Sequence, residues 1–341
     1  MKLIPRFTRV TRVTRVTRVT KVYTPVYKLS YTHTHTHNLT AEEEWDIPEG
    51  VPAEYSPQSA ASYTFDEQVH ATLIQEAEAA GKPREAQRLR RCAQPHSGGF
   101  ITALPSQLDG FDTILKPKTF RTAVYYRLGI PILDKEITCP TCMQTINIYG
   151  DHATCCTKTG DLITRHNAMR DLVELVARDG MLNPVLEKKG VLGPTTGKRP
   201  GDVTIPLWSQ GRALALDVAV TSPLTETHIG KKNPCEDYAH NYKHAKYDKD
   251  FKDSETHIFG AIIWETLGAV NSEGEDYLRQ IMRFAAKHLG REHSSFCGRI
   301  WARLSCILQR EVAKQINLRT NDQSFHEKTM GDTPEDQAED N

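Results

Sequence analysis

The chain has 341 residues, of which 43 are Lys or Arg and 43 are Asp or Glu, with 38% apolar residues and a mean hydropathy of −0.52. It has room for one large or two modest domains, and its zero net charge leaves nucleic acid open as a partner because local patches matter more than the sum. Its longest uncharged apolar run, Ile258 to Trp264, is far shorter than the roughly 20 residues that span a bilayer, and no apolar segment of a signal peptide follows Met1. We therefore expect no membrane span and no secretion.

Both ends of the chain have a biased composition. Residues 8 to 22 repeat Thr-Arg-Val four times and then read Thr-Lys-Val, and residues 32 to 37 alternate Thr and His. We predict that residues 1–64 are a low-complexity, disordered tract, whose three histidines are solvated rather than metal ligands. Residues 321–341 carry seven acids, one lysine and almost no large apolar side chain, which predicts a disordered acidic tail.

The folded part is expected between these tracts, and it begins with residues 65–135. Helical periodicity is found at residues 66–94, and residues 98–133 have the pattern of packed helices and turns. This region carries no obvious chemistry, and we interpret it as a helical linker.

A cluster of cysteines follows at residues 136–160. Cys139 and Cys142 stand two residues apart, and His152 and Cys156 complete the pattern C-x2-C-x9-H-x3-C. Two thiolates from a tight turn plus a second pair of soft ligands are the donor set of a closed structural zinc site, in a compartment that keeps thiols reduced. Cys155 competes as the fourth ligand, and the alternative is a group of free buried thiols.

A hairpin with two aspartates is predicted at residues 202–220. Residues 202–207 and 212–220 have strand composition, and residues 208–211 suit a four-residue turn. If Leu207 pairs with Arg212, Asp202 lies directly opposite Asp217, with Cβ atoms about 5 Å apart. The side chains that share the face of Asp217 are Ala213, Ala215 and Ala219. Two carboxylates among small side chains leave room for a divalent cation and a phosphate.

Two predicted helices flank this hairpin. The first covers residues 167–178, with Asn167 as its cap and Gly180 at its end, and the second covers residues 236–252 and carries Lys243 and Lys246. Further lysines lie nearby in sequence, at residues 188–189, 198 and 231–232. Such cations bind the phosphates of a nucleic-acid backbone. The alternative is an ordinary amphipathic hairpin, whose solvent face carries both aspartates and whose lysines are solvated.

The order of these motifs resembles the C-terminal part of non-LTR retrotransposon proteins that carry a restriction-like endonuclease, over roughly residues 95–318. The residues that match are Cys-Pro-x-Cys at 139–142, Gly150-Asp151-His152, Cys156, Arg165-His166-Asn167, Arg199-Pro200-Gly201-Asp202-Val203 and Leu-Asp-Val-Ala-Val-Thr at 216–221. Shorter matches lie upstream, at residues 104–106 and 126–129, and downstream, at residues 243–247 and 259–268.

The resemblance implies an α/β fold, a PD-D/E-x-K endonuclease at residues 161–320 with a mixed sheet flanked by helices. It implies that a zinc knuckle of Cys139, Cys142, His152 and Cys156 precedes the nuclease and helps to bind nucleic acid. It further implies that Asp202 and Asp217 bind catalytic Mg²⁺ or Mn²⁺, and that Glu187 is an auxiliary acid at the end of a strand over residues 183–188.

The chain departs from the family pattern at two positions. The family's lysine stands two residues after the second acid, where this chain has Ala219, so Lys243 or Lys246 would reach in from the next helix. Gly201 also separates Pro200 from Asp202.

The activity that the resemblance implies is a metal-dependent nick in DNA, with element RNA as a further partner and the nucleus as the location. The polymerase of the parent elements is not expected, because the sequence contains no Tyr/Phe-x-Asp-Asp motif. The alternatives are a module that binds nucleic acid without cleaving it and a transposon relic without function.

Overall fold

The computed structural model describes residues 57–106, 113–192 and 200–320. The chain divides into two compact units at Thr64, and the fold below is that of the second unit. The repeats at residues 8–37, the acidic tail at 321–341 and the basic pair at 198–199 lie outside the described residues. Residues 57–64 belong to a helix, in contrast to the disorder predicted for them.

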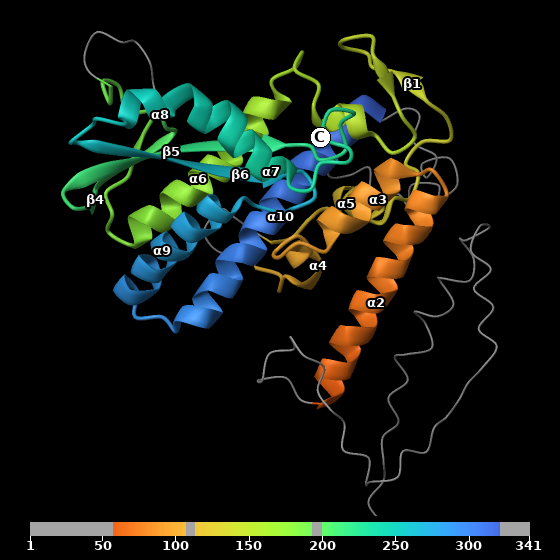
Figure 1. Ribbon diagram of the computed structural model, residues 1–341, viewed down its shortest axis with the longest axis horizontal. Coiled ribbons are helices and arrows are strands. Elements are labelled where there is room, and N and C mark those ends of the chain that lie inside the picture. The colour runs from red at the N-terminus through yellow and green to blue at the C-terminus, as the bar shows by residue number, and fades with distance from the viewer. Residues whose placement is uncertain (1–56, 107–112, 193–199, 321–341) are drawn as a thin grey trace, which may run out of the picture. The chain divides into compact units, whose positions relative to one another are not determined.

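The elements follow the chain in the order helices, small hairpin, then a sheet interleaved with helices (Figure 1). Their bounds are α2 (Pro57–Ala79), α3 (Pro83–Cys92), α4 (Gly99–Thr102), α5 (Pro117–Leu128), β1 (Ile137–Thr138), β2 (Thr145–Ile146), η2 (Asp151–Thr154), α6 (Asp161–Asp179), β3 (Val185–Leu186), β4 (Val203–Ser209), β5 (Arg212–Thr221), α7 (Pro234–Tyr238), η3 (Ala239–His244), α8 (Ala245–Phe251), β6 (His257–Glu265), α9 (Ser272–His288) and α10 (His293–Thr320). None of the helices in the described ranges combines the length and the apolar composition that a membrane span requires.

Four strands form a mixed sheet in the order β3-β4-β5-β6. Strands β5 and β6 pair in parallel, and the other neighbours are antiparallel. Figure 1 shows α6, α9 and α10 on one side of this sheet and α8 on the other. The predicted class, an α/β fold with a mixed sheet flanked by helices, is confirmed.

The main core lies between the sheet and helices α6, α9 and α10. The spacing of Met169, Leu172, Val173 and Val176 puts these residues on one side of α6, where all four are buried. The strand residues of this core are Val203, Ile205, Leu214, Leu216, Val218, Ile262 and Trp264. Alternate residues of β5 therefore face it, as the period of two requires.

A second, smaller core covers the opposite face of the sheet. Tyr247 and Phe251 of α8 pack against Phe259 of β6, with ring centroids 5.0 and 5.5 Å apart. Ala215 lies in this core and is 0% exposed. Burial on both faces explains the nearly continuous apolar composition of β5 and β6.

The structure corrects the predicted start of the helix at residues 167–178. Helix α6 begins at Asp161, six residues earlier, and Asn167 lies inside it rather than at its cap. The extra turns carry Ile163, which is exposed, and Arg165 and His166, so the apolar periodicity does not reveal them. The predicted end at Gly180 is confirmed.

The hairpin turn also differs from the prediction. Arg212 pairs with Ser209 rather than with Leu207, and the turn consists of Gln210 and Gly211, both with positive φ. Two extra residues in β4 form a bulge at which Leu207 adopts a φ of 54° and points outward, 80% exposed.

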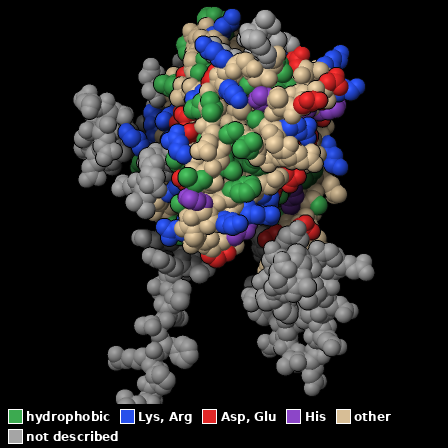
Figure 2. Space-filling model, turned by 90° about the vertical axis from the view of Figure 1, so that its left-hand side faces the viewer, with side chains coloured by type: hydrophobic (Ala, Val, Ile, Leu, Met, Phe, Trp, Pro, Cys, Tyr) green, Lys and Arg blue, Asp and Glu red, His purple; other side chains and the backbone are tan. Residues whose placement is uncertain are grey.

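The bulge lets Trp208 pack in place of Leu207. Its ring lies edge-on to Tyr277 and Phe284 of α9, at 6.0 and 6.1 Å. An indole buries more apolar surface than a leucine side chain, which favours this arrangement. Figure 2 looks at the side of the molecule where β4 and α8 lie, and apolar side chains gather in its middle.

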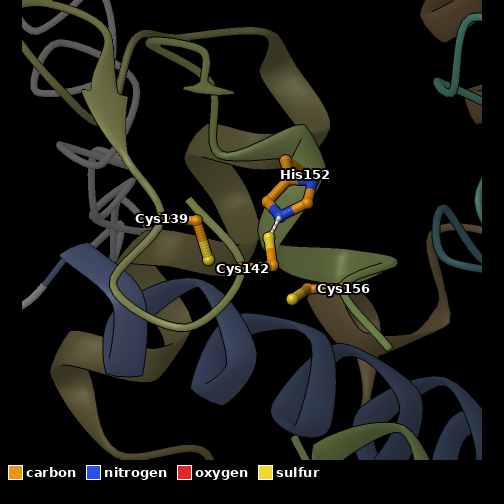
Figure 3. A group of neighbouring side chains, drawn as sticks. All are labelled: Cys139, Cys142, His152 and Cys156. Atoms are coloured by element: carbon orange, nitrogen blue, oxygen red, sulfur yellow. Dashed lines mark hydrogen bonds between the residues drawn. The ribbon is translucent and has the colours of Figure 1, made fainter. Parts of the chain in front are cut away.

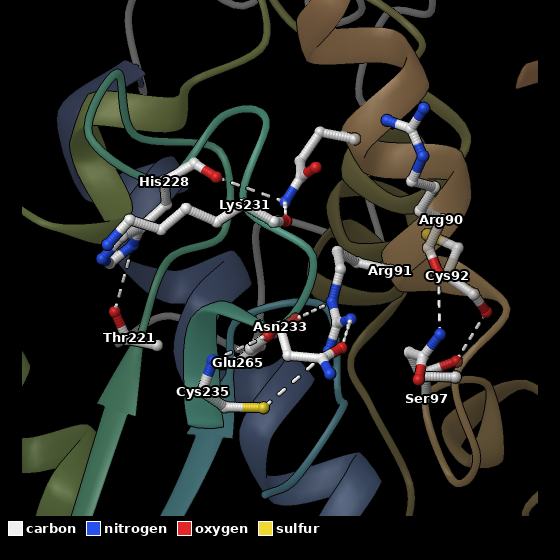
Figure 4. A network of polar contacts seen from close by, with 12 residues as sticks. Arg90, Arg91, Cys92, Ser97, Thr221, His228, Lys231, Asn233, Cys235 and Glu265 are labelled. Carbon is white, nitrogen blue, oxygen red and sulfur yellow. Dashed lines mark hydrogen bonds and ion pairs between the residues drawn. The ribbon is translucent and has the colours of Figure 1, made fainter. Parts of the chain in front are cut away.

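A buried ion pair joins helix α3 to the end of β6 (Figure 4). Glu265 is 0% exposed; it accepts a hydrogen bond from Nε of Arg91 at 2.7 Å and one from the backbone N–H of Cys235 at 3.1 Å. Arg91 also donates to the carbonyl oxygen of Lys232 at 2.9 Å and to Oδ1 of Asn233 at 3.0 Å. The pair therefore fixes the start of α7 against the sheet.

The loop between β5 and α7 is held by the same helix. Nε2 of Gln87 donates to the carbonyl oxygens of His228, at 3.3 Å, and Lys231, at 3.0 Å. Within the loop, Nδ1 of His228 lies 2.7 Å from the carbonyl oxygen of Ser222. These bonds determine where α7, and η3 after it, cross the face of the sheet.

We expect the fold to be strongly destabilised when one partner of this buried ion pair is removed. Arg91→Met leaves the Glu265 carboxylate buried without a counter-charge, so the free energy of unfolding should fall by about 3–5 kcal/mol in a urea titration. The matched control is Arg90→Met. Arg90 pairs with Glu78 at the surface, where both side chains are at least a third exposed, and its loss should cost less than about 1 kcal/mol. Equal costs for the two variants would contradict this assignment.

Candidate functional site

The four predicted zinc ligands come together beside the β1–β2 hairpin (Figure 3). Cys139 and Cys142 lie in the turn between β1 and β2, where the backbone N–H of Met143 donates to the carbonyl oxygen of Cys139. His152 is on the short helix η2, and Cys156 follows this helix. The ligand atoms of the four side chains all lie within 4.8 Å of one another.

This arrangement can hold a metal ion such as zinc. Nε2 of His152 lies 3.0 Å from Sγ of Cys142, so the two donor atoms face each other. Burial raises the pKa of the Cys139 thiol, but hydrogen bonds from the backbone amides of Thr141 and Cys142 outweigh it and lower this pKa to about 6. A thiolate is the form that binds metal, so the turn prepares Cys139 for that role.

The structure also decides between the two candidates for the fourth ligand. Cys155 directs its thiol to the carbonyl oxygens of Asp151, at 3.9 Å, and His152, at 3.5 Å. Cys156 instead packs with Cys139 and Cys142 in the small core of this hairpin. The predicted set with Cys156 is therefore the one whose atoms converge.

Two arginines fasten the cysteine cluster to the rest of the fold. Arg84 of α3 forms a bidentate ion pair with Asp151, the residue before His152, and its guanidinium lies over the ring of Tyr149 at 3.8 Å. Arg165 of α6 is buried and donates to the carbonyl oxygen of Thr154 at 2.9 Å. Burial lowers the pKa of Arg165 to about 10.

A second site lies where β4 and β5 bring Asp202 and Asp217 together. The register Val203 to Leu216 continues to these two residues, as predicted, and the backbone N–H of Asp202 donates to the carbonyl oxygen of Leu216 at 2.7 Å. Oδ2 of Asp202 accepts a hydrogen bond from the backbone N–H of Val218 at 2.6 Å. The two carboxylates thus meet at one end of the hairpin.

The backbone before Asp202 explains why a glycine stands at position 201. Its φ is 91°, a conformation that favours glycine. A Cβ at this position would lie 3.0 to 3.1 Å from the backbone and Cβ of Ala215 on the next strand. Gly201 therefore lets the chain enter β4 close against β5.

Asp217 is 7% exposed, which excludes the alternative of a solvated hairpin face. Helix segment η3 covers it, and Nζ of Lys243 forms an ion pair with its Oδ2. This oxygen is buried, and its partner is a positive charge. The position next to it therefore suits a cation.

The pKa values of the two carboxyl groups are shifted in opposite directions. Burial raises the pKa of Asp217, and the charge of Asp202 adds to this rise against the effect of Lys243. Burial also acts to raise the pKa of Asp202, but His166 and the N–H of Val218 outweigh it and lower that pKa. Two neighbouring carboxylates repel each other when both are ionised. Such a pair is typical of a site that binds a cation.

Of the two candidate lysines, the structure brings Lys243 to the acids. Burial opposes the protonated form of Lys243, but the ion pair with Asp217 is stronger and raises its pKa. Lys246 is exposed, and its ammonium lies over the ring of Tyr247 at 4.5 Å. The two lysines therefore occupy different environments, although the sequence alone gives no reason to prefer one of them as the catalytic lysine.

Glu187 contacts Asp202 through its backbone, whereas its carboxylate points elsewhere. The predicted strand over residues 183–188 is only two residues long, and Glu187 follows it with a φ of 49°. Its backbone N–H donates to the carbonyl oxygen of Asp202 at 2.9 Å. Its carboxylate is exposed and pairs with Arg170 at 3.0 Å.

The sequence analysis did not assign His166 or Arg170 to the site. Nε2 of His166 lies 3.3 Å from Oδ1 of Asp202, and Arg170 stands one turn further along α6. Their spacing of four residues on one helix is the signal that could have revealed them. It was hidden because the predicted helix began at Asn167.

Comparison with models of protein families, with curated proteins and with solved structures gave no match.

We expect the cysteine cluster to bind one zinc ion per chain. Cys139→Ser and Cys156→Ser should each lose the metal and lower the melting temperature, since binding to a closed site stabilises the fold. The matched control is Cys155→Ser, next to Cys156 in sequence, which should keep the metal. Metal content by atomic absorption on the purified full chain checks this. Retention of zinc by Cys156→Ser together with its loss from Cys155→Ser would reverse the assignment.

Proposed function

We propose that this chain is a Mg²⁺-dependent endonuclease that nicks DNA, with the restriction-endonuclease-like fold of the retrotransposon family that its motifs resemble. The observation that carries the proposal is the meeting of Asp202, Asp217 and Lys243 at one end of a mixed sheet. Two carboxylates and a lysine are the groups that phosphodiester hydrolysis needs, to hold a cation and to neutralise developing charge. The order of the surrounding motifs adds to this support.

The residues present fit a divalent cation. Mg²⁺ prefers carboxylate oxygens and is bound through one or two of them. Asp202 and Asp217 supply two neighbouring carboxylates, and the Lys243 ammonium at Oδ2 of Asp217 shows that this position already holds a positive charge. Asp202 and Asp217 would hold the ion. When bound, it neutralises charge on the phosphate and lowers the pKa of water toward neutrality.

The protein side chains have distinct parts in this reaction. Lys243, whose ammonium lies within the site, is placed to donate to a phosphate oxygen or to orient the attacking water. His166 holds the Asp202 carboxylate from α6, at 3.3 Å. The N–H of Val218 fixes the other oxygen of Asp202, so the first acid has a defined orientation before substrate arrives.

The cysteine cluster completes the proposal as a structural zinc knuckle. Its three cysteines and one histidine form a closed donor set, with no ligand position that a catalytic water would need. DNA is the substrate, and element RNA is a further partner that the resemblance suggests. A nuclear location follows if the substrate is chromosomal.

Plasmid nicking by the purified full chain tests the proposal. With Mg²⁺ or Mn²⁺ the wild type should convert supercoiled to relaxed plasmid, and Asp202→Asn and Asp217→Asn should each lower the rate by about 10²-fold or more. Lys243→Ala should cause a comparable loss. The matched control is Lys246→Ala, three residues away and exposed, which should nick at nearly the wild-type rate.

Folding is monitored on the same samples by zinc content and circular dichroism. Absence of nicking by a folded, zinc-loaded wild type would contradict the proposal, as would full activity of Asp217→Asn. Equal losses from Lys243→Ala and Lys246→Ala would contradict the role of Lys243.

A further inference from the structure

Two tyrosines form a stacked pair next to the acid site. The rings of Tyr238 and Tyr242 have centroids 5.0 Å apart and an interplanar angle of 26°. Tyr238 is half-buried and packs against the smaller core, whereas Tyr242 is 57% exposed. One ring is thus anchored, and the other lies on it with much of its surface in solvent.

The π-helical turn η3 places this pair beside Lys243. In such a turn the backbone hydrogen bonds join residues that are five apart. The residues four and five positions after Tyr238 are therefore both about one helical turn from it. These residues are Tyr242 and Lys243, and both lie next to Tyr238. Nζ of Lys243 lies 6.0 Å from the centroid of the Tyr238 ring and pairs with Asp217. The aromatic stack consequently adjoins the acid pair through a single lysine.

The chemistry of this juxtaposition fits a nucleobase. An exposed aromatic face stacks on any base, and the Lys243 ammonium beside the stacked pair suits the phosphate of the same nucleotide. Of the three residues between the tyrosines, Ala239 is buried in the smaller core, whereas His240 and Asn241 are exposed and polar, unlike the apolar centre of a protein interface. Bases inside a duplex already stack on each other, so only an unpaired base is available to the ring.

We propose that Tyr242, backed by Tyr238, stacks on an unpaired nucleobase next to the scissile phosphate. This inference rests on the proposed endonuclease function and adds to it the class of substrate, which is single-stranded or locally unpaired nucleic acid at the point of cleavage. Tyr242 acts as a binding and specificity residue, and the acids and Lys243 carry the chemistry.

Binding without cleavage tests this platform directly. The full, zinc-loaded chain, without Mg²⁺ or Mn²⁺ and without chelator, is titrated into a single-stranded oligodeoxynucleotide that contains 2-aminopurine, whose fluorescence is quenched by stacking, and into its duplex. The wild type should bind the single strand more tightly and quench it. Tyr242→Ala should abolish the quenching and weaken single-strand binding roughly tenfold, whereas Tyr242→Phe keeps the ring and should behave as wild type.

Phe284→Ala is the matched control, because Phe284 is an aromatic residue of similar exposure, 46%, on helix α9 and not beside the acids. It should bind and quench as the wild type does. Equal binding of single strand and duplex with no effect of Tyr242→Ala would overturn the platform. So would a Tyr242→Phe variant as weak as Tyr242→Ala, since the hydroxyl and not the ring would then be responsible.

The outcomes separate this inference from the proposed function. Quenching that depends on Tyr242 in a protein that nicks no plasmid would support the platform and refute the nuclease. Nicking without any dependence of binding on Tyr242 would support the nuclease and refute the platform. The same titration with an oligoribonucleotide shows whether the unpaired base belongs to DNA or to RNA, and binding of neither by the wild type would overturn the inference.

Discussion

The pairing of β4 with β5 is the constraint on which the acid site depends. The backbone N–H of Asp202 donates to the carbonyl oxygen of Leu216, and the N–H of Val218 donates to the Asp202 carboxylate. These two bonds fix Asp202 against the strand that carries Asp217. Because side chains alternate across a strand, a slip of one residue would turn Asp217 into the main core and remove one of the two carboxylates. The close approach at Gly201 makes this register possible.

Burial of the sheet on both faces gives the acid pair its electrostatic character. Segments α7, η3 and α8 cover the face that Asp217 shares with Ala215, so the carboxylate is 7% exposed rather than solvated. Removal from water makes its negative charge unfavourable, and the nearby charge of Asp202 adds to this effect. A cation relieves both costs. Lys243 is the cation that the described chain itself supplies.

The placement of Lys243 depends in turn on contacts far from it in sequence. The ion pair of Arg91 with Glu265 and the bonds of Gln87 hold the loop that leads into α7. Helix α3 therefore determines where η3 begins to cross the sheet. The same helix carries Arg84, which fastens the cysteine cluster through Asp151. The predicted linker region is thus the common support of both candidate sites.

The sequence determined the local features of this protein. The spacing of Cys139, Cys142, His152 and Cys156 predicts a common site because two short turns bring these ligands together, and the structure shows their atoms converging. The alternation of small and large residues in β5 predicts which of its faces meets the main core. The register of Asp202 with Asp217 also follows from local pairing, although the turn assumed for it was wrong.

The tertiary structure decided the rest, because it depends on contacts between distant segments. Because of a two-residue bulge, Trp208 packs against α9 where the predicted register would place Leu207. The sequence of the hairpin contains no pattern that predicts this bulge. The choice of Lys243 over Lys246 follows from a π-helical turn packed on the sheet, whereas an ordinary helix leaves both lysines on one side. His166 reaches Asp202 because α6 crosses beside β4, a juxtaposition set by the core and not by either segment alone.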